Sequence, residues 1–153
     1  MIKLVCVGKI KENFIKDGIL EYTKRLSAYD SFSIVEVKEV NTKSIMDNMK
    51  NEGENILNKI GDDEFVITLE IEGKMLDSKE LASLIDNKKT YGTSKITFVI
   101  GGSNGLSQEV KSRSNYALSF SRFTFPHQLM RLIFVEQLYR AMTILNNNPY
   151  HHE

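Results

Sequence analysis

The sequence is short of the features that mark secreted and membrane proteins. It has one cysteine, Cys6, so no internal disulfide can form and nothing points to a disulfide-stabilised secreted fold. Its apolar runs are far shorter than the roughly 20 residues that a membrane-spanning helix needs, and residues 1–8 are too short an apolar stretch for a signal peptide. We therefore expect a soluble, cytoplasmic protein, and a length of 153 residues favours a single domain over residues 1–153.

Net charge is also lacking, since 20 Lys and Arg balance 20 Asp and Glu. Residues 1–112 nevertheless hold 16 basic and 18 acidic side chains, whereas residues 113–153 hold four Arg, no Lys and two Glu. All three His and both Pro lie in this last quarter. Because no linker precedes it, we interpret the last quarter as the functional end of one fold. Without a net positive charge, any RNA contact must be local.

Strand-like and helix-like patterns alternate from the first residues onward. Short runs rich in Val, Ile and Phe predict strands at Ile2–Val7, Phe32–Val37, Phe65–Ile71, Lys95–Ile100 and Ala117–Phe120. Apolar residues at helical spacing predict helices at 12–28, 42–60, 78–89, 107–115 and 128–145, the third capped by Ser78. Because helices between strands force parallel connections, we expect an α/β domain. Its sheet should be mostly parallel, with about five strands and helices on both faces.

Three segments stand where such a fold binds ligands. Ligands of an open parallel sheet lie beyond the carboxyl ends of its strands. The fourth predicted strand runs into a glycine-rich turn, 101–105, whose backbone a ligand can approach closely. The third strand ends in the charged segment 68–74, and a phenylalanine-rich loop, 120–128, follows the fifth. The turn matches neither a phosphate-binding P-loop nor a full dinucleotide fingerprint, and each segment alone also fits an ordinary turn.

The loop after the fifth strand is unusually apolar. Phe120, Phe123 and Phe125 stand close to Pro126, and three such rings are costly to leave in water. We therefore expect the loop to pack against something. It either plugs the core or forms the wall of an apolar ligand pocket.

The helix predicted at 128–145 is apolar over more than one stripe. Such a helix either lies under other elements or meets a second subunit, and we favour a homodimer interface. Glu136 and Arg140 stand four residues apart and are expected to pair. In the tail, His151 and His152 are adjacent, but a metal site needs three or more ligands in defined geometry, so we expect no metal.

Read together, these segments resemble the RlmH family, small SPOUT-class methyltransferases of bacterial 23S rRNA. The resemblance spans the whole chain and rests on Leu69–Lys74, Val99–Leu106, Phe125–Gln128, Glu136–Ala141 and Asn148–His151, in that order. It implies transfer of a methyl group from S-adenosylmethionine to N3 of a pseudouridine in 23S rRNA of the assembled ribosome. It also implies a homodimer and a C-terminal trefoil knot, a rare exception to the rule that protein chains are unknotted.

The resemblance also assigns residues. Cofactor contacts fall on Leu69, Gly101, Phe120, Ser121, Arg122, Phe123, Thr124 and Phe125. The tail corresponds to the end that faces the substrate, which places Tyr150 and His151 near the target base as catalytic residues. Many relatives carry Lys or Arg after that pair, whereas here the residue is His152, which is mostly neutral at pH 7.

Further roles stay open at the level of sequence. Either His151 or, as the weaker candidate, His127 could remove the proton from N3. Arg131 and Arg140 could hold RNA phosphates or carboxylates of a partner subunit, so we count both, with His127 and His152, among the substrate-binding candidates. We expect a site shared across the dimer. The rival readings are an NAD-dependent oxidoreductase, which would need a glycine fingerprint at the first strand, and a catalytically silent ribosome-binding module.

Overall fold

In the computed structural model, which describes residues 1–152, strands and helices alternate along the chain. The elements are β1 (Ile2–Val7), α1 (Asn13–Leu26), β2 (Phe32–Val37), α2 (Ile45–Leu57), β3 (Phe65–Met75), α3 (Ser78–Tyr91), β4 (Ile96–Ile100), α4 (Gln108–Arg113), β5 (Tyr116–Ser119) and α5 (His127–Leu145). The strands form one five-stranded sheet in the order β2-β1-β4-β3-β5, and every neighbouring pair is parallel. The predicted α/β fold is confirmed.

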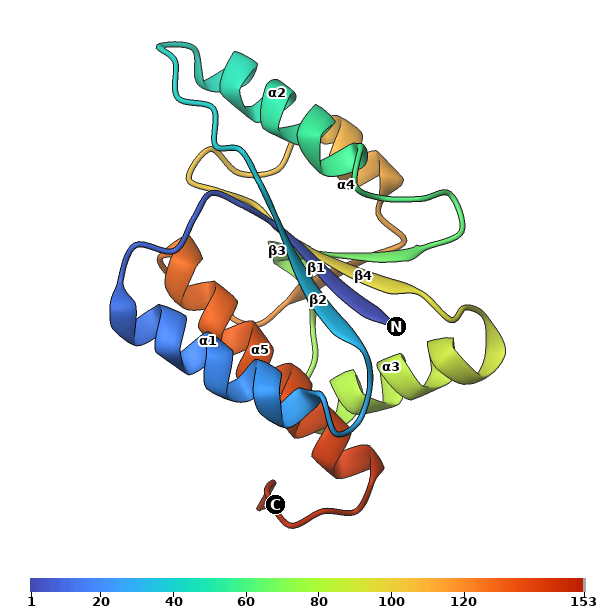
Figure 1. Ribbon diagram of the computed structural model, residues 1–153. Helices are drawn as coiled ribbons and strands as arrows, with labels where there is room; N and C mark the ends of the chain where they lie inside the picture. Colours follow the sequence, from blue (N-terminus) through green and yellow to red (C-terminus); the bar gives the residue numbers. More distant parts are fainter. Residues whose placement is uncertain (153) are drawn as a thin grey trace.

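Helices cover both faces of this sheet, as predicted. Helices α1, α3 and α5 lie on one face and α2 and α4 on the other (Figure 1). Strand β1 shows why the core has two halves: Ile2, Leu4 and Cys6 face the first group of helices, whereas Val5 and Val7 face the second. Side chains of successive strand residues point to opposite faces, so a strand buried on both sides reads as a continuous apolar run.

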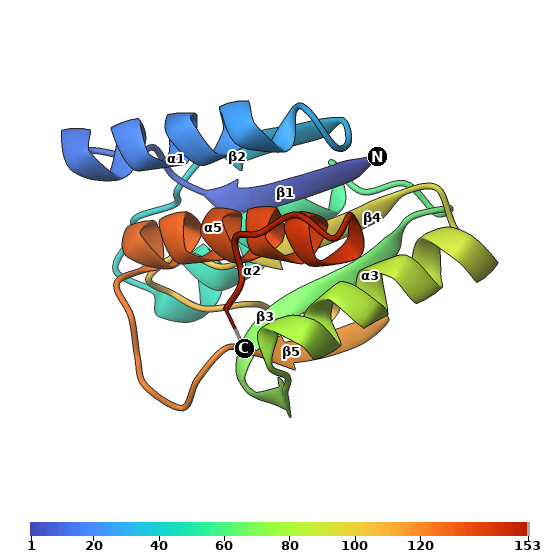
Figure 2. The ribbon, with the colours of Figure 1, turned by 90° about the horizontal axis from the view of Figure 1, so that it is seen from below.

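Helix α5 occupies the middle of its layer. Seen from that side, it lies between α1 and α3 (Figure 2), and no residue from His127 to Leu145 is exposed. The contact with α1 is close, because a Cβ on Gly18 would stand 2.8 Å from Cδ1 of Leu132. Coverage within one chain therefore accounts for the apolar character of α5. A second protomer remains a prediction.

Strand β3 continues four residues beyond its predicted end at Ile71. Its pairing with β5 is interrupted by a register shift between Leu69 and Lys74, after which the two strands pair again. The approach at the second contact needs a glycine, since a Cβ on Gly73 would lie 2.7 Å from the backbone of Ala117. This extension carries β3 past the edge of the sheet toward the loop that follows β5.

Two helix starts differ from the prediction. The N-cap of α3 is Asp77, whose side chain accepts a hydrogen bond from the N–H of Glu80, so the assignment of Ser78 as the cap is wrong. The hydroxyl of Ser78 instead donates to Oε1 of Gln137 at 2.6 Å and ties α3 to α5. Helix α2 begins at Ile45 rather than at residue 42, capped by Ser44. No helix within residues 1–152 is long and apolar enough to cross a membrane.

Candidate functional site

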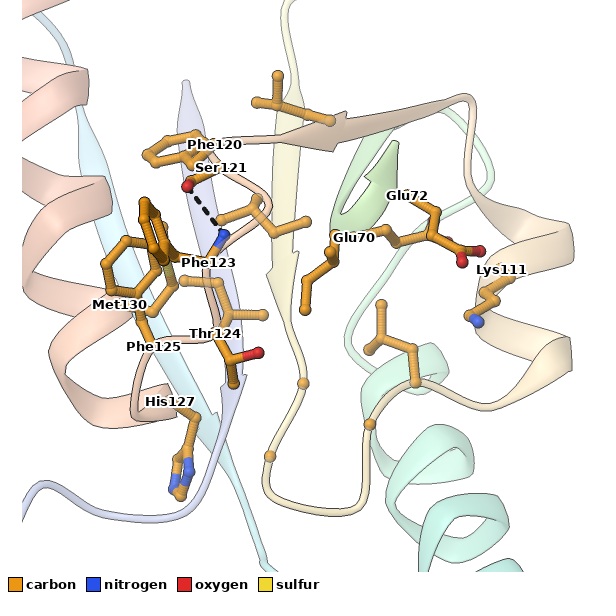
Figure 3. Close-up of a pocket in the computed structure, with 18 residues that line it drawn as sticks. Glu70, Glu72, Lys111, Phe120, Ser121, Phe123, Thr124, Phe125, His127 and Met130 are labelled. Atoms are coloured by element: carbon orange, nitrogen blue, oxygen red, sulfur yellow. Dashed lines mark hydrogen bonds between the residues drawn. The ribbon is translucent and has the colours of Figure 1, made fainter. Parts of the chain in front are cut away.

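A pocket of about 510 Å³ opens at the carboxyl ends of β3, β4 and β5. It lies between the three segments that the sequence singled out. The loop after β5 forms one side, Glu70, Glu72 and Lys111 stand on the other, and the glycine turn runs between them (Figure 3). The lining residues are Leu69, Glu70, Ile71, Glu72, Ile100, Gly101, Gly102, Gly105, Leu106, Lys111, Leu118, Phe120, Ser121, Phe123, Thr124, Phe125, His127 and Met130.

The glycine turn brings bare backbone to the pocket wall. A Cβ on Gly101 would stand 3.0 Å from Cδ2 of Leu106 and 3.2 Å from the carbonyl carbon of Gly105, which leaves little room for a side chain. Gly105 has a φ of +82°, a left-handed conformation that favours glycine. Its N–H donates to the oxygen of Gly102 at 3.0 Å and closes the turn.

The loop after β5 is held in shape by its serines. The hydroxyl of Ser119 donates to the carbonyl of Ser121 at 3.1 Å, and the N–H of Phe123 donates to Oγ of Ser121 at 3.0 Å (Figure 3). Phe120 packs toward Phe134 of the core, with ring centroids 6.3 Å apart. Phe123, by contrast, is 77% exposed, so the expectation that all three rings pack away from water is wrong for this one. The loop is a pocket wall rather than a core plug.

The opposite side of the pocket carries the two carboxylates of Glu70 and Glu72 and the ammonium group of Lys111. Glu70 and Glu72 lie on β3 within its register shift against β5, between Leu69 and Lys74. The hydroxyl of Thr68 donates to Oε2 of Glu70 at 2.6 Å and holds that carboxylate at the strand end. The two carboxylates outnumber the one ammonium group, so this side is weakly acidic and favours a ligand with a positive group facing it.

The structure brings together seven of the eight residues assigned to the cofactor. Arg122 is the exception, since it lines an adjoining hollow with Ile71, Glu72, Gly73 and Met75. His127, assigned to the substrate, also lines the main pocket. Sequence reasoning missed Lys111 and Met130 as lining residues. Lys111 had a usable signal, because it lies on the helix that the glycine turn leads into and therefore points back over the turn.

Arg131 is a correction. It was assigned to RNA phosphates or a partner's carboxylates, but its side chain is buried, with 1% of the residue exposed. Its guanidinium donates to Oε2 of Glu36 at 2.7 Å and to the carbonyls of Val7 and Gly8 at 2.9 and 3.1 Å. Arg131 thus joins α5 to the ends of β1 and β2, and it faces the interior of its own chain.

The tail folds back along α5 and α1, away from the pocket. Tyr150 donates its hydroxyl proton to Oε2 of Glu136 at 2.7 Å, and its oxygen lies 3.4 Å from that of Tyr22. Burial, with the hydrogen bonds to Tyr22 and Glu136, raises the pKa of the Tyr150 hydroxyl well above its ordinary value. In this position Tyr150 is a proton donor to a carboxylate and not a base.

Arg140 organises the same cluster. It donates to Oε2 of Glu136 at 2.7 Å, which confirms the expected pair, and contacts Nδ1 of His151 at 3.2 Å. Since arginine has no acceptor, Nδ1 of His151 accepts this hydrogen bond. His152 is exposed. Neither Tyr150, His151, His152 nor Arg140 lines the pocket of its own chain.

Burial raises the pKa of the Cys6 thiol to about 12, so Cys6 is protonated and poorly suited to act as a nucleophile. Among the described residues, no group of three or more His, Cys, Asp or Glu is placed to hold a metal ion.

Comparison with known proteins agrees with this geometry. A family model described as "Predicted SPOUT methyltransferase" matches residues 1–151. The chain belongs to the SPOUT methyltransferase family. It is 54% identical to the ribosomal RNA large subunit methyltransferase H of Bacillus pumilus and 51% identical to that of Carboxydothermus hydrogenoformans. Both alignments cover 98% of this chain and 98% of the relative, which places the chain in the RlmH group of the family.

A solved structure of low sequence similarity shares this fold. The probable methylase family protein from Haemophilus influenzae Rd KW20 superposes with a TM-score of 0.56 at 15% identity, covering 99% of this chain and 70% of the other. At that identity the match speaks for the fold alone. Membership of the SPOUT family implies the C-terminal trefoil knot that the resemblance led us to expect.

Proposed function

We propose that this protein transfers a methyl group from S-adenosylmethionine to N3 of a pseudouridine in 23S rRNA of the assembled ribosome. We also propose that it acts in the cytoplasm as a homodimer. One observation carries the proposal: in a chain of the RlmH group, Leu69, Gly101 and the loop after β5, which are remote in sequence, converge on one pocket, with Arg122 as the one assigned residue outside it. These are the positions to which the resemblance assigned the cofactor.

The pocket suits S-adenosylmethionine in three respects. A volume of about 510 Å³ lies within the usual range for small-molecule sites. Phe120, Phe125 and Leu69 offer apolar surface for the adenine, and Gly101 lets the ligand approach the backbone. Glu70 and Glu72 supply negative charge on the other side, which complements the positive groups of the cofactor.

The main task of the protein is to position the methyl group and the nucleophile. When bound, the cofactor supplies an electrophilic methyl group on a sulfonium sulfur. The pocket residues fix that group and exclude water, because an in-line displacement needs the nucleophile, methyl group and leaving atom aligned. Phe120 and Phe125 shield the apolar side of the pocket from water, while the glycine turn forms the floor of the pocket.

The proton on N3 must also leave. If its pKa stands about two units above the ambient pH, removing the proton costs about 2.7 kcal/mol, a gap that one base can close. His127 already lines the pocket. His151 can act as the base once its Nδ1 is released from Arg140.

Each active site would combine two protomers. In its own chain the tail is bonded to Glu136 and Tyr22 and contributes no residue to the pocket. For Tyr150 and His151 to stand near the target base, the tail of one protomer must therefore meet the pocket of the other. This arrangement also supplies RNA contacts that the neutral single chain lacks.

The decisive experiment compares 23S rRNA from cells with and without this protein by mass mapping. We expect one methyl group, on a pseudouridine, to be missing from the second sample. Calorimetry with S-adenosylmethionine and with NADH distinguishes this proposal from an NAD-dependent oxidoreductase, because a methyltransferase should bind only the first. A ribosome-binding module without activity would leave the rRNA masses unchanged and overturn the proposal.

A further inference from the structure

The glycine turn that floors the pocket rests on helix α2. Two consecutive residues of α2, Glu52 and Gly53, meet the turn and the start of α4. Neither residue lines the pocket, and neither was singled out by the sequence. They lie behind the wall, on the side away from the ligand.

Glu52 joins three segments through one carboxylate oxygen. Its Oε2 accepts from the N–H of Val40 at 2.9 Å and from Nδ2 of Asn104 at 3.2 Å. Asn104 also lies 3.4 Å from the carbonyl of Val40. The segment after β2, helix α2 and the glycine turn therefore meet at Glu52, which is 1% exposed.

The second oxygen of Glu52 faces the turn without a partner. Oε1 is buried and has no hydrogen bond within residues 1–152, and it lies 3.7 Å from the position of a Cβ on Gly102. The same position is 3.0 Å from Cγ1 of Val7. A buried polar atom left unsatisfied is costly and calls for an explanation. Here Gly102, which lines the pocket, is held between Val7 and Glu52.

Gly53 supports the far end of the turn. A Cβ at this position would stand 2.2 Å from Oγ of Ser107, so α2 and the start of α4 touch with no space for a side chain. Ser107 caps α4, because its hydroxyl accepts from the N–H of Val110 at 3.3 Å. Helix α2 thus contacts the chain at Asn104 and again at Ser107.

We propose that Glu52 is a positioning residue for cofactor binding, which holds the 101–105 turn in its binding shape through Asn104. The inference rests on the proposed function, since the turn is taken as the floor of an S-adenosylmethionine site. A buried carboxylate with one unsatisfied oxygen is a poor choice for stability alone. Its place behind the turn is explained when the turn must keep one geometry for a ligand.

The test compares cofactor affinity in Glu52→Ala, Glu52→Gln and Asn104→Ala with that of the unmutated protein, by calorimetry with S-adenosylmethionine. Glu52→Ala and Asn104→Ala should each weaken binding about tenfold or more, as loss of a supporting residue behind a site often does. Their combination should weaken it little further, because both remove the same contact. Glu52→Gln should recover most of the affinity, since its amide oxygen still accepts from Val40 and Asn104.

Asn48→Asp is the matched control. Asn48 lies one turn earlier on α2 and is 2% exposed, and within residues 1–152 its side chain bonds to Thr42, away from the glycine turn. Asn48→Asp should lower the melting temperature but leave the Kd for S-adenosylmethionine within about twofold of that of the unmutated protein. Hydrogen exchange of the free protein adds a second readout: the amides of Gly102–Gly105 should exchange faster in Glu52→Ala and at the normal rate in Asn48→Asp.

The outcomes separate this inference from the proposed function. If the unmutated protein binds S-adenosylmethionine and both Glu52→Ala and Asn104→Ala bind it equally well, the role of Glu52 is overturned and the proposed function stands. If Glu52→Ala does not fold, Asn104→Ala alone decides, because Asn104 lies outside the core. If the unmutated protein itself fails to bind the cofactor, both proposals fall.

Discussion

Single residues of the last quarter divide into those that hold the fold and those that are placed to act. Arg131 belongs to the first group. Its three acceptors, Glu36 and the carbonyls of Val7 and Gly8, lie on β2 and at the end of β1. The pattern of apolar residues around Arg131 predicts a helix but says nothing about which arginine points inward. Only the packing of α5 on the sheet decides that.

Arg131→Ala should therefore lower the free energy of unfolding by about 3 kcal/mol, because it leaves buried carbonyls without a donor and opens a cavity. Urea denaturation measures this loss. Arg122→Ala is the control, since Arg122 is exposed and its loss should change stability by less than about 0.5 kcal/mol. Equal stability of the two variants would contradict the structural role of Arg131.

Tyr150 gives a prediction that depends on pH. Burial and its hydrogen bonds raise the pKa of its hydroxyl above the ordinary value near 10. The stabilisation that goes with a raised pKa is complete below the unfolded value and is lost as the pH rises toward the folded one. Tyr150→Phe should cost about 1 kcal/mol near neutral pH, and the difference from the unmutated protein should shrink above about pH 10.

Denaturant titrations near pH 7 and near pH 11 test this expectation. Tyr91→Phe serves as the control because the Tyr91 side chain is 83% exposed and should leave the pH profile unchanged. If the difference in unfolding free energy between Tyr150→Phe and the unmutated protein stays constant across this range, the hydrogen bond to Glu136 does not depend on the protonation of Tyr150, and the prediction is wrong.

At the scale of elements, the sequence predicted the order and type of every strand and helix. The prediction succeeds because the strands of a sheet that is covered on both faces are continuous apolar runs, and such runs are easy to recognise in a sequence. The last four residues of β3 were missed, since Glu72 and Lys74 are charged and do not show the apolar pattern of a buried strand. The register shift between Leu69 and Lys74 arises in the pairing of β3 with β5, which lies far along the chain. The local sequence of β3 therefore does not predict it.

The tail, residues 150–153, is expected to act in methyl transfer but not in cofactor binding. Deleting residues 150–153 should abolish methyl transfer to the ribosome and spare the binding of S-adenosylmethionine, because no tail residue among those described lines the pocket. The deletion also removes the contact of Tyr150 with Glu136, so its thermal stability should be measured in parallel. A truncated protein with full activity would remove the tail from the mechanism.

At the scale of the molecule, the pocket was predictable and the course of the tail was not. Parallel strands present their carboxyl ends at one edge, so three strand ends far apart in sequence converge there. The tail follows no such rule: its course depends on Glu136, Arg140 and Tyr22 offering the right partners on α5 and α1. Its separation from the pocket is what makes a paired arrangement necessary to the proposed mechanism.

A mixing experiment tests that arrangement. Gly101→Val should block the pocket, and a chain ending at residue 149 lacks the tail, so each alone should be inactive. After unfolding and refolding together in equal amounts, half of the dimers are mixed, and each holds one intact pocket facing one intact tail. Activity should return to about a quarter of that of the unmutated protein. No recovery, or sedimentation as a monomer at micromolar concentration, would contradict the shared site.

The central place of α5 has a consequence for how the chain is made. Helices α1 and α3 are synthesised before α5, yet the surface between them is closed only by α5. Until then, the apolar side chains of β1 and β4 that α5 will cover stay open to water and to other nascent chains. This face of the core therefore closes only after α5 has been synthesised, and any delay before α5 packs between α1 and α3 should favour aggregation.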